Sequence, residues 1–176
     1  IQLQLNLIKH PVLNGSFFIN FSIFIILFTI GIGGFEEVAW RGYLISKILQ
    51  NRFSWNSLII MTGIIWAIWH LPTHFYKFEN HFYIQYPFFI ITCFELSIIM
   101  AYFRLKTNSI IPAIIIHSVI AVFYESFFRD SGNQENYYYL TFPSIALIIM
   151  LFPLAFYYFR QGGKLYIEQI ESNRKL

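Results

Sequence analysis

The chain has 176 residues, of which 57% are hydrophobic and only 12% are charged, and its formal net charge is +3. Because soluble domains carry about 25% charged residues, this composition excludes an ordinary water-soluble protein and indicates that the lipid bilayer is the solvent. The single cysteine, Cys93, excludes an internal disulfide. The sequence has neither a basic patch with interleaved aromatic residues nor a glycine loop that would cradle phosphates, so we expect no nucleic-acid partner.

Five apolar segments are each close to the ~20 residues that a helix needs to cross a ~30 Å hydrocarbon core. In chain order they are residues 17–34, 55–71, 82–103, 109–128 and 139–159. Residues 36–50 form a sixth helical segment, which is charged and short for a full span. The sequence therefore predicts an all-α, polytopic transmembrane helical bundle of about five to six membrane helices. We expect one domain over residues 1–160, followed by a polar C-terminal tail, 161–176, outside the bilayer.

A glycine cluster, Gly31, Gly33 and Gly34, separates the first span from residues 36–50. It predicts either a turn between two helices or a break within membrane-buried backbone, which must be shielded by protein or water. If residues 36–50 return across the membrane, most cations fall on one side, and the positive-inside rule makes that side the cytoplasm. These cations are Lys9, Lys47, Arg52, Arg104, Lys106, Arg160, Lys164, Arg174 and Lys175, against Lys77 and Arg129 on the other side.

Three charged residues follow this cluster in the stretch "EEVAWRG". An ionised side chain inside a bilayer costs several kcal/mol, so such residues usually face a cavity and pair with one another. On a helix, Glu37 and Arg41 are four residues apart and share a face, whereas Glu36 is rotated from Glu37 by about 100°. We interpret Arg41 as the partner that neutralises and orients Glu37, which leaves Glu36 for a cavity. The alternative is a solvated helix start at the membrane surface, where carboxylates are favourable.

Two histidines lie in apolar surroundings. His70 ends the run "GIIWAIWHLP", and His117 lies within "IIPAIIIHSVIAVFY". A buried imidazole needs a hydrogen-bond partner, so each is either functional or structural: an interfacial ring for His70, and a ring bonded to a neighbouring helix for His117. His74 and His81 accompany polar residues, which favours an interfacial position for both.

Glu95, in "ITCFELSII", is a further carboxyl group inside an apolar segment. It is a candidate catalytic group, a counter-charge for Arg41 or a histidine, or a protonated acid, and we favour structural pairing. Intramembrane ionisable residues also mark ion pathways. Glu95 therefore makes a small transporter an alternative class of function.

In order along the chain, these motifs resemble the CAAX protease and bacteriocin-processing (CPBP) family of intramembrane proteases. "EEVAWR", residues 36–41, matches the family's EExxxR motif, and "WAIWH", residues 66–70, matches its FxxxH motif with tryptophan at the aromatic position. "HSVIA", residues 117–121, keeps the histidine of the HxxxN-type motif, but Ala121 stands where the family usually has asparagine. The resemblance covers residues 17–128.

The resemblance implies a membrane-embedded endopeptidase whose catalytic residues are Glu36, Glu37, Arg41, His70 and His117. Glu36 is then the general base and His70 helps to position the attacking water. His117 donates to the developing oxyanion, and with Ala121 present the second donor must be Ser118, Tyr124 or a backbone amide.

A metal-dependent version is the alternative to this mechanism. Glu36, His70 and His117 make a His₂Glu set, which matches the ligands of catalytic zinc sites, although HExxH is missing. We favour the metal-free version and expect no cofactor, because Glu37 and Arg41 already explain how a charged Glu36 is held.

The expected partners are the lipid bilayer and a peptide or membrane-protein substrate. Richness in Ile, Phe, Asn, Lys and Tyr is typical of AT-rich genomes, so we expect an integral protein of a bacterial cell membrane that processes bacteriocins or signal peptides or acts in self-immunity. Ala121 motivates the alternative function, which is a catalytically inactive relative that binds and regulates a membrane partner.

Overall fold

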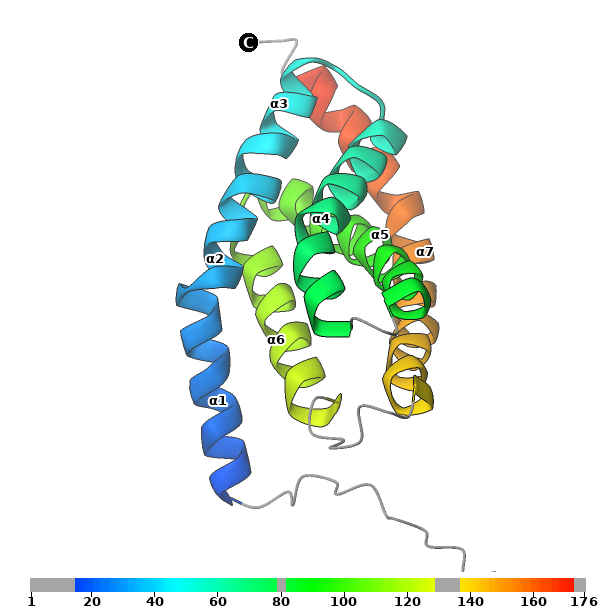
Figure 1. The fold of residues 1–176 in the computed structure, drawn as a ribbon. Helices are drawn as coiled ribbons and strands as arrows, with labels where there is room; N and C mark the ends of the chain where they lie inside the picture. Colours follow the sequence, from blue (N-terminus) through cyan, green and yellow to red (C-terminus); the bar gives the residue numbers. More distant parts are fainter. Residues whose placement is uncertain (1–14, 79–81, 129–136, 173–176) are drawn as a thin grey trace, which may run out of the picture.

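The computed structural model of the protein describes residues 15–78, 82–128 and 137–172, and these residues form helices and no strand (Figure 1). The prediction of an all-α helical bundle is confirmed. The elements are α1 (Gly15–Ile30), α2 (Ile32–Glu37), the π-helix η1 (Val38–Leu44), α3 (Ile45–Gln50), α4 (Trp55–Phe78), α5 (Phe82–Thr107), α6 (Ile111–Phe128) and α7 (Tyr137–Ser172).

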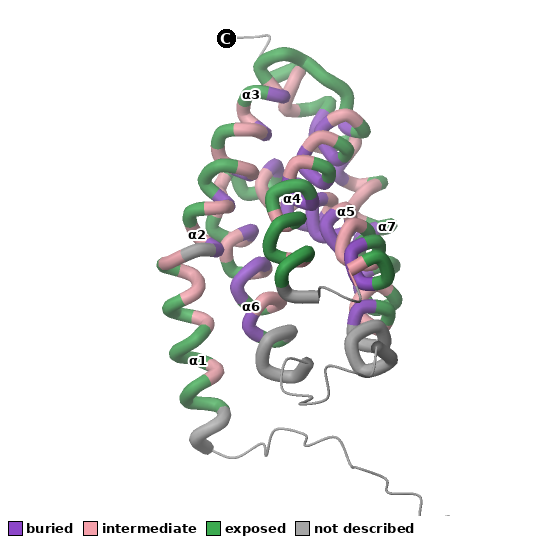
Figure 2. The backbone as a smooth tube through the Cα atoms, in the orientation of Figure 1, coloured by how far each residue is buried: buried purple, intermediate pink, exposed green. Residues whose placement is uncertain are grey.

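Three of the described helices are long and apolar enough to cross a membrane: Trp55–Tyr76, Phe82–Thr107 and Ser144–Ser172. A fourth candidate span is made of two arms, Phe18–Ile30 and Gly33–Gln50. The described apolar part of α6, Ile111–Phe123, is shorter. Figure 2 shows that buried residues concentrate on α5, whereas α1 and much of α7 are exposed. Because the exposed side chains are largely apolar, lipid is the solvent that suits this surface.

The glycine cluster produces a bend of 42° between the two arms of that fourth span, and not a turn that reverses the chain. The Gly31 N–H still bonds the Leu27 carbonyl at 2.9 Å. A Cβ at Gly34 would lie 2.4 Å from the Thr29 carbonyl oxygen, so the bent backbone leaves no room for a side chain there. Of the two alternatives, the break within helical backbone is the one observed.

Several described cations lie toward one end of the bundle. Figure 1 shows α3, its connection to α4 and the C-terminal end of α7 at this end, whereas the N-terminal end of α1 lies at the opposite end. These segments carry Lys47, Arg52 and Lys164, and the end of α5, with Arg104 and Lys106, is joined to α7 by the hydrogen bond from Gln169 to the Leu105 carbonyl. Residues 36–50 continue onward from α1 instead of returning, and Lys9 lies outside the described residues. The membrane side that this end faces stays a prediction from the positive-inside rule.

The π-helix η1 begins directly after Glu37 and contains Arg41. Such widened turns often occur at functional sites. The Nε of Arg104, on α5, donates to the Arg41 carbonyl oxygen at 3.0 Å, and its Nη1 donates to Asn108 Oδ1 at 2.9 Å. A side chain from α5 therefore satisfies a carbonyl of the widened turn.

Helix α7 extends through residues 161–172, where the sequence predicts a polar tail. Tyr166 is 2% exposed, its hydroxyl donates to the Phe53 carbonyl, and Gln169 Nε2 donates to the Leu105 carbonyl at 3.1 Å. Helix α7 thus continues past residue 160 without a break, because Gly162, Tyr166 and Ile170 recur at helical spacing and continue one packed face.

We predict that Gly162→Ala destabilises the bundle by about 1–3 kcal/mol, the usual cost of an overpacked contact. A Cβ at Gly162 would lie 2.5 Å from Trp55 Cζ2, whereas a Cβ at Gly163 would lie 3.6 Å from Trp55 Cδ1, an ordinary contact. Thermal unfolding in detergent micelles measures the effect, with Gly163→Ala as the matched control. Equal melting temperatures for the two variants would contradict the packing described.

Candidate active site

Glu36, near the end of α2, is held by two tryptophans of α4. Trp66 Nε1 donates to its Oε2 at 3.2 Å, and Trp69 Nε1 donates to its Oε1 at 3.2 Å. The two indoles are three residues apart, so they share a face of α4. With its side chain only 10% exposed, Glu36 lies inside the protein and each carboxylate oxygen has one donor.

Glu37 belongs to a separate, fully buried network. Arg41 Nη1 lies 2.9 Å from Glu37 Oε1, and both side chains are 0% exposed. His117 Nδ1 lies 3.0 Å from the same oxygen. Arg41 Nη2 also donates to Ser97 Oγ at 3.4 Å, and its guanidinium lies 4.4 Å from the centre of the Trp66 ring. The alternative that these charges form a solvated helix start is wrong, because Glu37 and Arg41 are sealed in the interior.

The His70 ring faces Glu36 with its unprotonated nitrogen when it is neutral. His70 Nδ1 lies 3.1 Å from the Trp66 carbonyl oxygen, which can only accept, so Nδ1 carries the hydrogen. His70 Nε2 lies 3.9 Å from Glu36 Oε2. This separation is too long for a direct hydrogen bond and matches two acceptors bridged by one water molecule.

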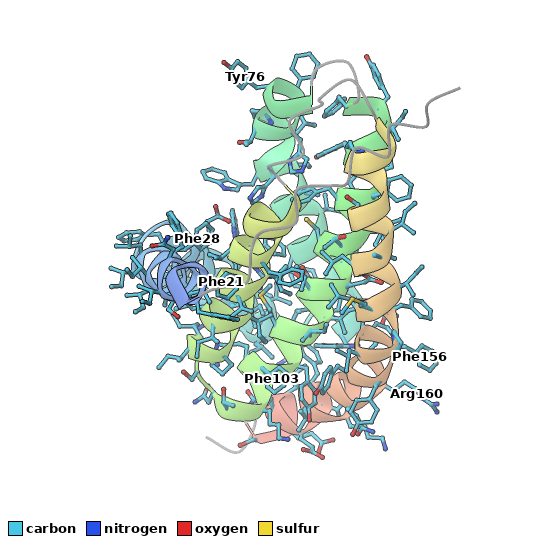
Figure 3. The ribbon with its side chains drawn as sticks, turned by 90° about the horizontal axis from the view of Figure 1, so that it is seen from below. Phe21, Phe28, Tyr76, Phe103, Phe156 and Arg160 are labelled. Atoms are coloured by element: carbon cyan, nitrogen blue, oxygen red, sulfur yellow. The ribbon has the colours of Figure 1, made fainter. Side chains whose placement is uncertain are left out.

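Glu36, His70 and His117 line one cavity of about 460 Å³. Phe28 is the α1 residue that reaches it, and the Phe28 ring lies edge-on to His117 with centroids 5.6 Å apart. Figure 3 shows α1 end-on beside the bundle, with Phe28 labelled. The cavity walls are mainly aromatic and aliphatic, with polar groups at intervals: Phe28, Glu36, Trp66, Trp69, His70, Thr73, His74, Gln85, Phe89, Thr92, Leu96, His117, Ile120, Ala121, Ser144 and Leu147.

The structure places Glu36, His70 and His117 on the wall of one cavity, but in two separate groups. Glu36 faces His70, and His117 is bonded to Glu37. Within the described part of the chain, no three His, Cys, Asp or Glu side chains are grouped as metal ligands. The donor arrangement therefore does not fit the His₂Glu zinc set.

Two other expectations from the sequence are revised. His74 lies on α4, lines the cavity and packs its ring on Phe89 with centroids 3.9 Å apart, so it is not simply interfacial; His81 lies outside the described residues. Ser118 is buried and donates to the Ile114 carbonyl at 2.8 Å, so its hydrogen is not available as an oxyanion donor. The Tyr124 side chain also lies outside the described residues.

Glu95 pairs with neither Arg41 nor any histidine among the described residues. It is 5% exposed, and neither carboxylate oxygen has a hydrogen-bond partner among the described residues. The expected structural pairing is absent there, and Glu95 does not line the cavity described above.

Sequence reasoning missed Trp69, Ser97 and Arg104. The signal for Trp69 was present: two tryptophans three residues apart, next to His70, place two N–H donors on one helix face. Ser97 and Arg104 gave no such signal, because each contacts Arg41 from a helix more than fifty residues away in the chain.

Comparison with known proteins identifies relatives of this chain. A family model described as type II CAAX prenyl endopeptidase, Rce1-like, matches residues 18–123, which include every motif above. The chain is 38% identical over 93 residues to CAAX prenyl protease 2 of Methanococcus maripaludis, an alignment that covers 49% of this chain and 34% of that relative. The matched part is thus about a third of the relative's length. No solved structure matches the chain.

We predict that Glu37→Gln destabilises the fold by about 3–5 kcal/mol, since it leaves the buried Arg41 charge without its partner. Denaturant unfolding in mixed micelles measures the change. Glu95→Gln is the matched control, because it makes the same substitution at a buried helical glutamate with no described hydrogen-bond partner, and it should cost far less. If the two variants lose the same stability, the pair does not hold the site together.

Proposed function

We propose that this chain, which belongs to the Rce1-like family of type II CAAX prenyl endopeptidases, is a membrane-embedded endopeptidase. Its substrate is a peptide or the C-terminal segment of a membrane protein, and the name of the Methanococcus relative suggests that this segment is prenylated. Processing of a bacteriocin or signal peptide, or self-immunity, in a bacterial cell membrane is the biological setting that we favour. The observation that carries the proposal is Glu36, a carboxylate held inside an otherwise mainly apolar cavity.

Glu36 acts as the general base on the attacking water. A water between Glu36 Oε2 and His70 Nε2 donates one hydrogen to each acceptor, which leaves an oxygen lone pair for the scissile carbonyl carbon. As the C–O bond forms, Glu36 takes a proton from the water. It then passes that proton to the leaving amine as the C–N bond breaks. A well-placed base contributes on the order of 10²–10⁴-fold to the rate.

His117 is the proposed donor to the developing oxyanion. Its Nδ1 is engaged on Glu37 Oε1 at 3.0 Å, so the ring can donate into the cavity only through Nε2. Glu37 Oε1 is shared between the Arg41 guanidinium and this ring, which holds the ring in place at the cavity wall. Ala121 lines the same cavity without a donor, so oxyanion stabilisation rests mainly on His117.

A second function has one specific observation in its favour. Ala121 replaces the asparagine usual in the resemblance and leaves that part of the cavity wall apolar. If this loss abolishes turnover, the protein is an inactive relative that binds and regulates a membrane partner. Partner binding by a parent protein that cleaves nothing would favour this reading.

We predict that Glu36→Gln reduces peptide cleavage by at least about 10²-fold, because the amide cannot accept the proton of the water. The assay follows release of the C-terminal fragment from a prenylated peptide by protein reconstituted in proteoliposomes. Glu95→Gln is the control, and it should keep the parent rate because Glu95 does not line the cavity. Unchanged turnover by the Glu36 variant would reject the proposal.

We also predict that cleavage survives thorough metal removal, since the base and the oxyanion donor are side chains of the protein. The same proteoliposome assay is run after dialysis against EDTA and after a second dialysis with added zinc. A rate that falls on chelation and returns with zinc would replace the metal-free mechanism with the metal-dependent one.

A further inference from the structure

The carboxylate of Glu36 has a second donor at a position that none of the three motifs specifies. Trp66 is the aromatic position of the WAIWH motif, whereas Trp69 is one of its intervening residues. Yet the two indoles contact Glu36 at the same distance, 3.2 Å, and bond different oxygens. The Glu36 carboxylate is thus held between two N–H groups from consecutive turns of α4.

Two donors do what one cannot. The terminal torsion of a glutamate side chain is broad, so a single donor leaves the plane of the carboxylate free to turn. Trp66 and Trp69 bond one oxygen each, and the oxygen bonded by Trp66 also lies 3.9 Å from His70 Nε2. The two oxygens are chemically equivalent, so the Trp69 bond does not choose between them: it fixes the plane of the carboxylate and thereby keeps the oxygen bonded by Trp66 facing His70.

The surroundings of the two indoles differ. Trp66 is 3% exposed, and its ring packs against Arg41, His70 and His117. Trp69 is 58% exposed, lines the cavity and meets Trp40 edge-on with ring centroids 6.0 Å apart. Trp66 is fixed by the core, so the orientation of the carboxylate depends on the more accessible Trp69.

We propose that Trp69 is a positioning residue, whose indole N–H fixes the plane of the Glu36 carboxylate so that the oxygen bonded by Trp66 also faces His70. This inference rests on the proposed function. It assigns Trp69 no contact with the reacting atoms: the indole acts through Glu36. Loss of the N–H leaves the base present but free to rotate, which lowers kcat and leaves substrate binding, and therefore KM, unchanged.

The first test compares Trp69→Phe with Trp40→Phe in the proteoliposome assay. The two rings contact each other, but Trp40 Nε1 has no hydrogen-bond partner among the described residues. We expect Trp69→Phe to lower kcat by about 10- to 100-fold, the loss of one hydrogen bond to a charged group, at constant KM. Trp40→Phe should keep the parent kcat. Equal rates for the two variants would overturn the proposal.

A second variant separates the N–H from the bulk of the ring. Benzothienylalanine at position 69 has the shape of tryptophan with sulfur in place of the N–H. We expect it to lower kcat as Trp69→Phe does, with a melting temperature equal to that of the parent. If this analogue keeps the parent kcat, then the ring and not its hydrogen bond matters, and the proposal fails.

A third measurement does not depend on activity. In protein labelled with ¹⁵N at the indole nitrogens, Glu36→Gln should move the Trp66 and Trp69 N–H resonances and leave those of Trp40 and Trp55, whose indole nitrogens have no described partner. An unmoved Trp69 resonance would overturn the inference whatever the enzyme does. A different result would be a parent protein that cleaves nothing although both resonances respond. That result would overturn the proposed function and the kinetic role of Trp69, whereas the hydrogen bond from Trp69 to Glu36 would stand.

Discussion

The buried ion pair between Glu37 and Arg41 is the interaction on which the rest of the site depends. Both side chains are 0% exposed, and a buried charge without a partner costs several kcal/mol, so neither residue can be accommodated here alone. The pair in turn holds other parts in place: His117 bonds the same Glu37 oxygen, and the Trp66 ring packs on the guanidinium. One pair therefore ties α2, η1, α4 and α6 together at the level of the cavity.

Glu36 and Glu37 are neighbours in the chain, but their side chains point in different directions and contact different partners. Because neighbouring helical residues point about 100° apart, the pairing of Glu37 with Arg41 turns Glu36 towards α4 and its two indoles. The bend at the glycine cluster, 42° between the two arms, lies just before this point. The π-helix begins just after it, and Arg104 on α5 bonds the Arg41 carbonyl there. The charged segment is thus placed by irregular backbone on both sides.

How much could be predicted depended on how local each interaction is. The Glu37–Arg41 pair follows from a spacing of four residues, and the apolar segments follow from hydropathy, so both could be predicted. The bonding of His117 to Glu37 instead of its grouping with Glu36 and His70 could not, because it depends on how α6 packs against α2. The continuation of α7 was hidden by its polar composition: a helix with one buried face and one polar face reads as a tail when average hydropathy is the guide.

The distribution of hydrogen-bond donors shows where this site is preorganised. Two indoles are directed at the ground-state carboxylate of Glu36, whereas the wall that would face an oxyanion has His117 and the donor-free Ala121. Donors on a carboxylate are already in place before the reaction and hold the group in one orientation. Since only interactions that strengthen in the transition state raise the rate, the gain from the indoles must come from orientation. In the proposed mechanism, catalysis therefore depends more on the position of Glu36 than on the stabilisation of the intermediate.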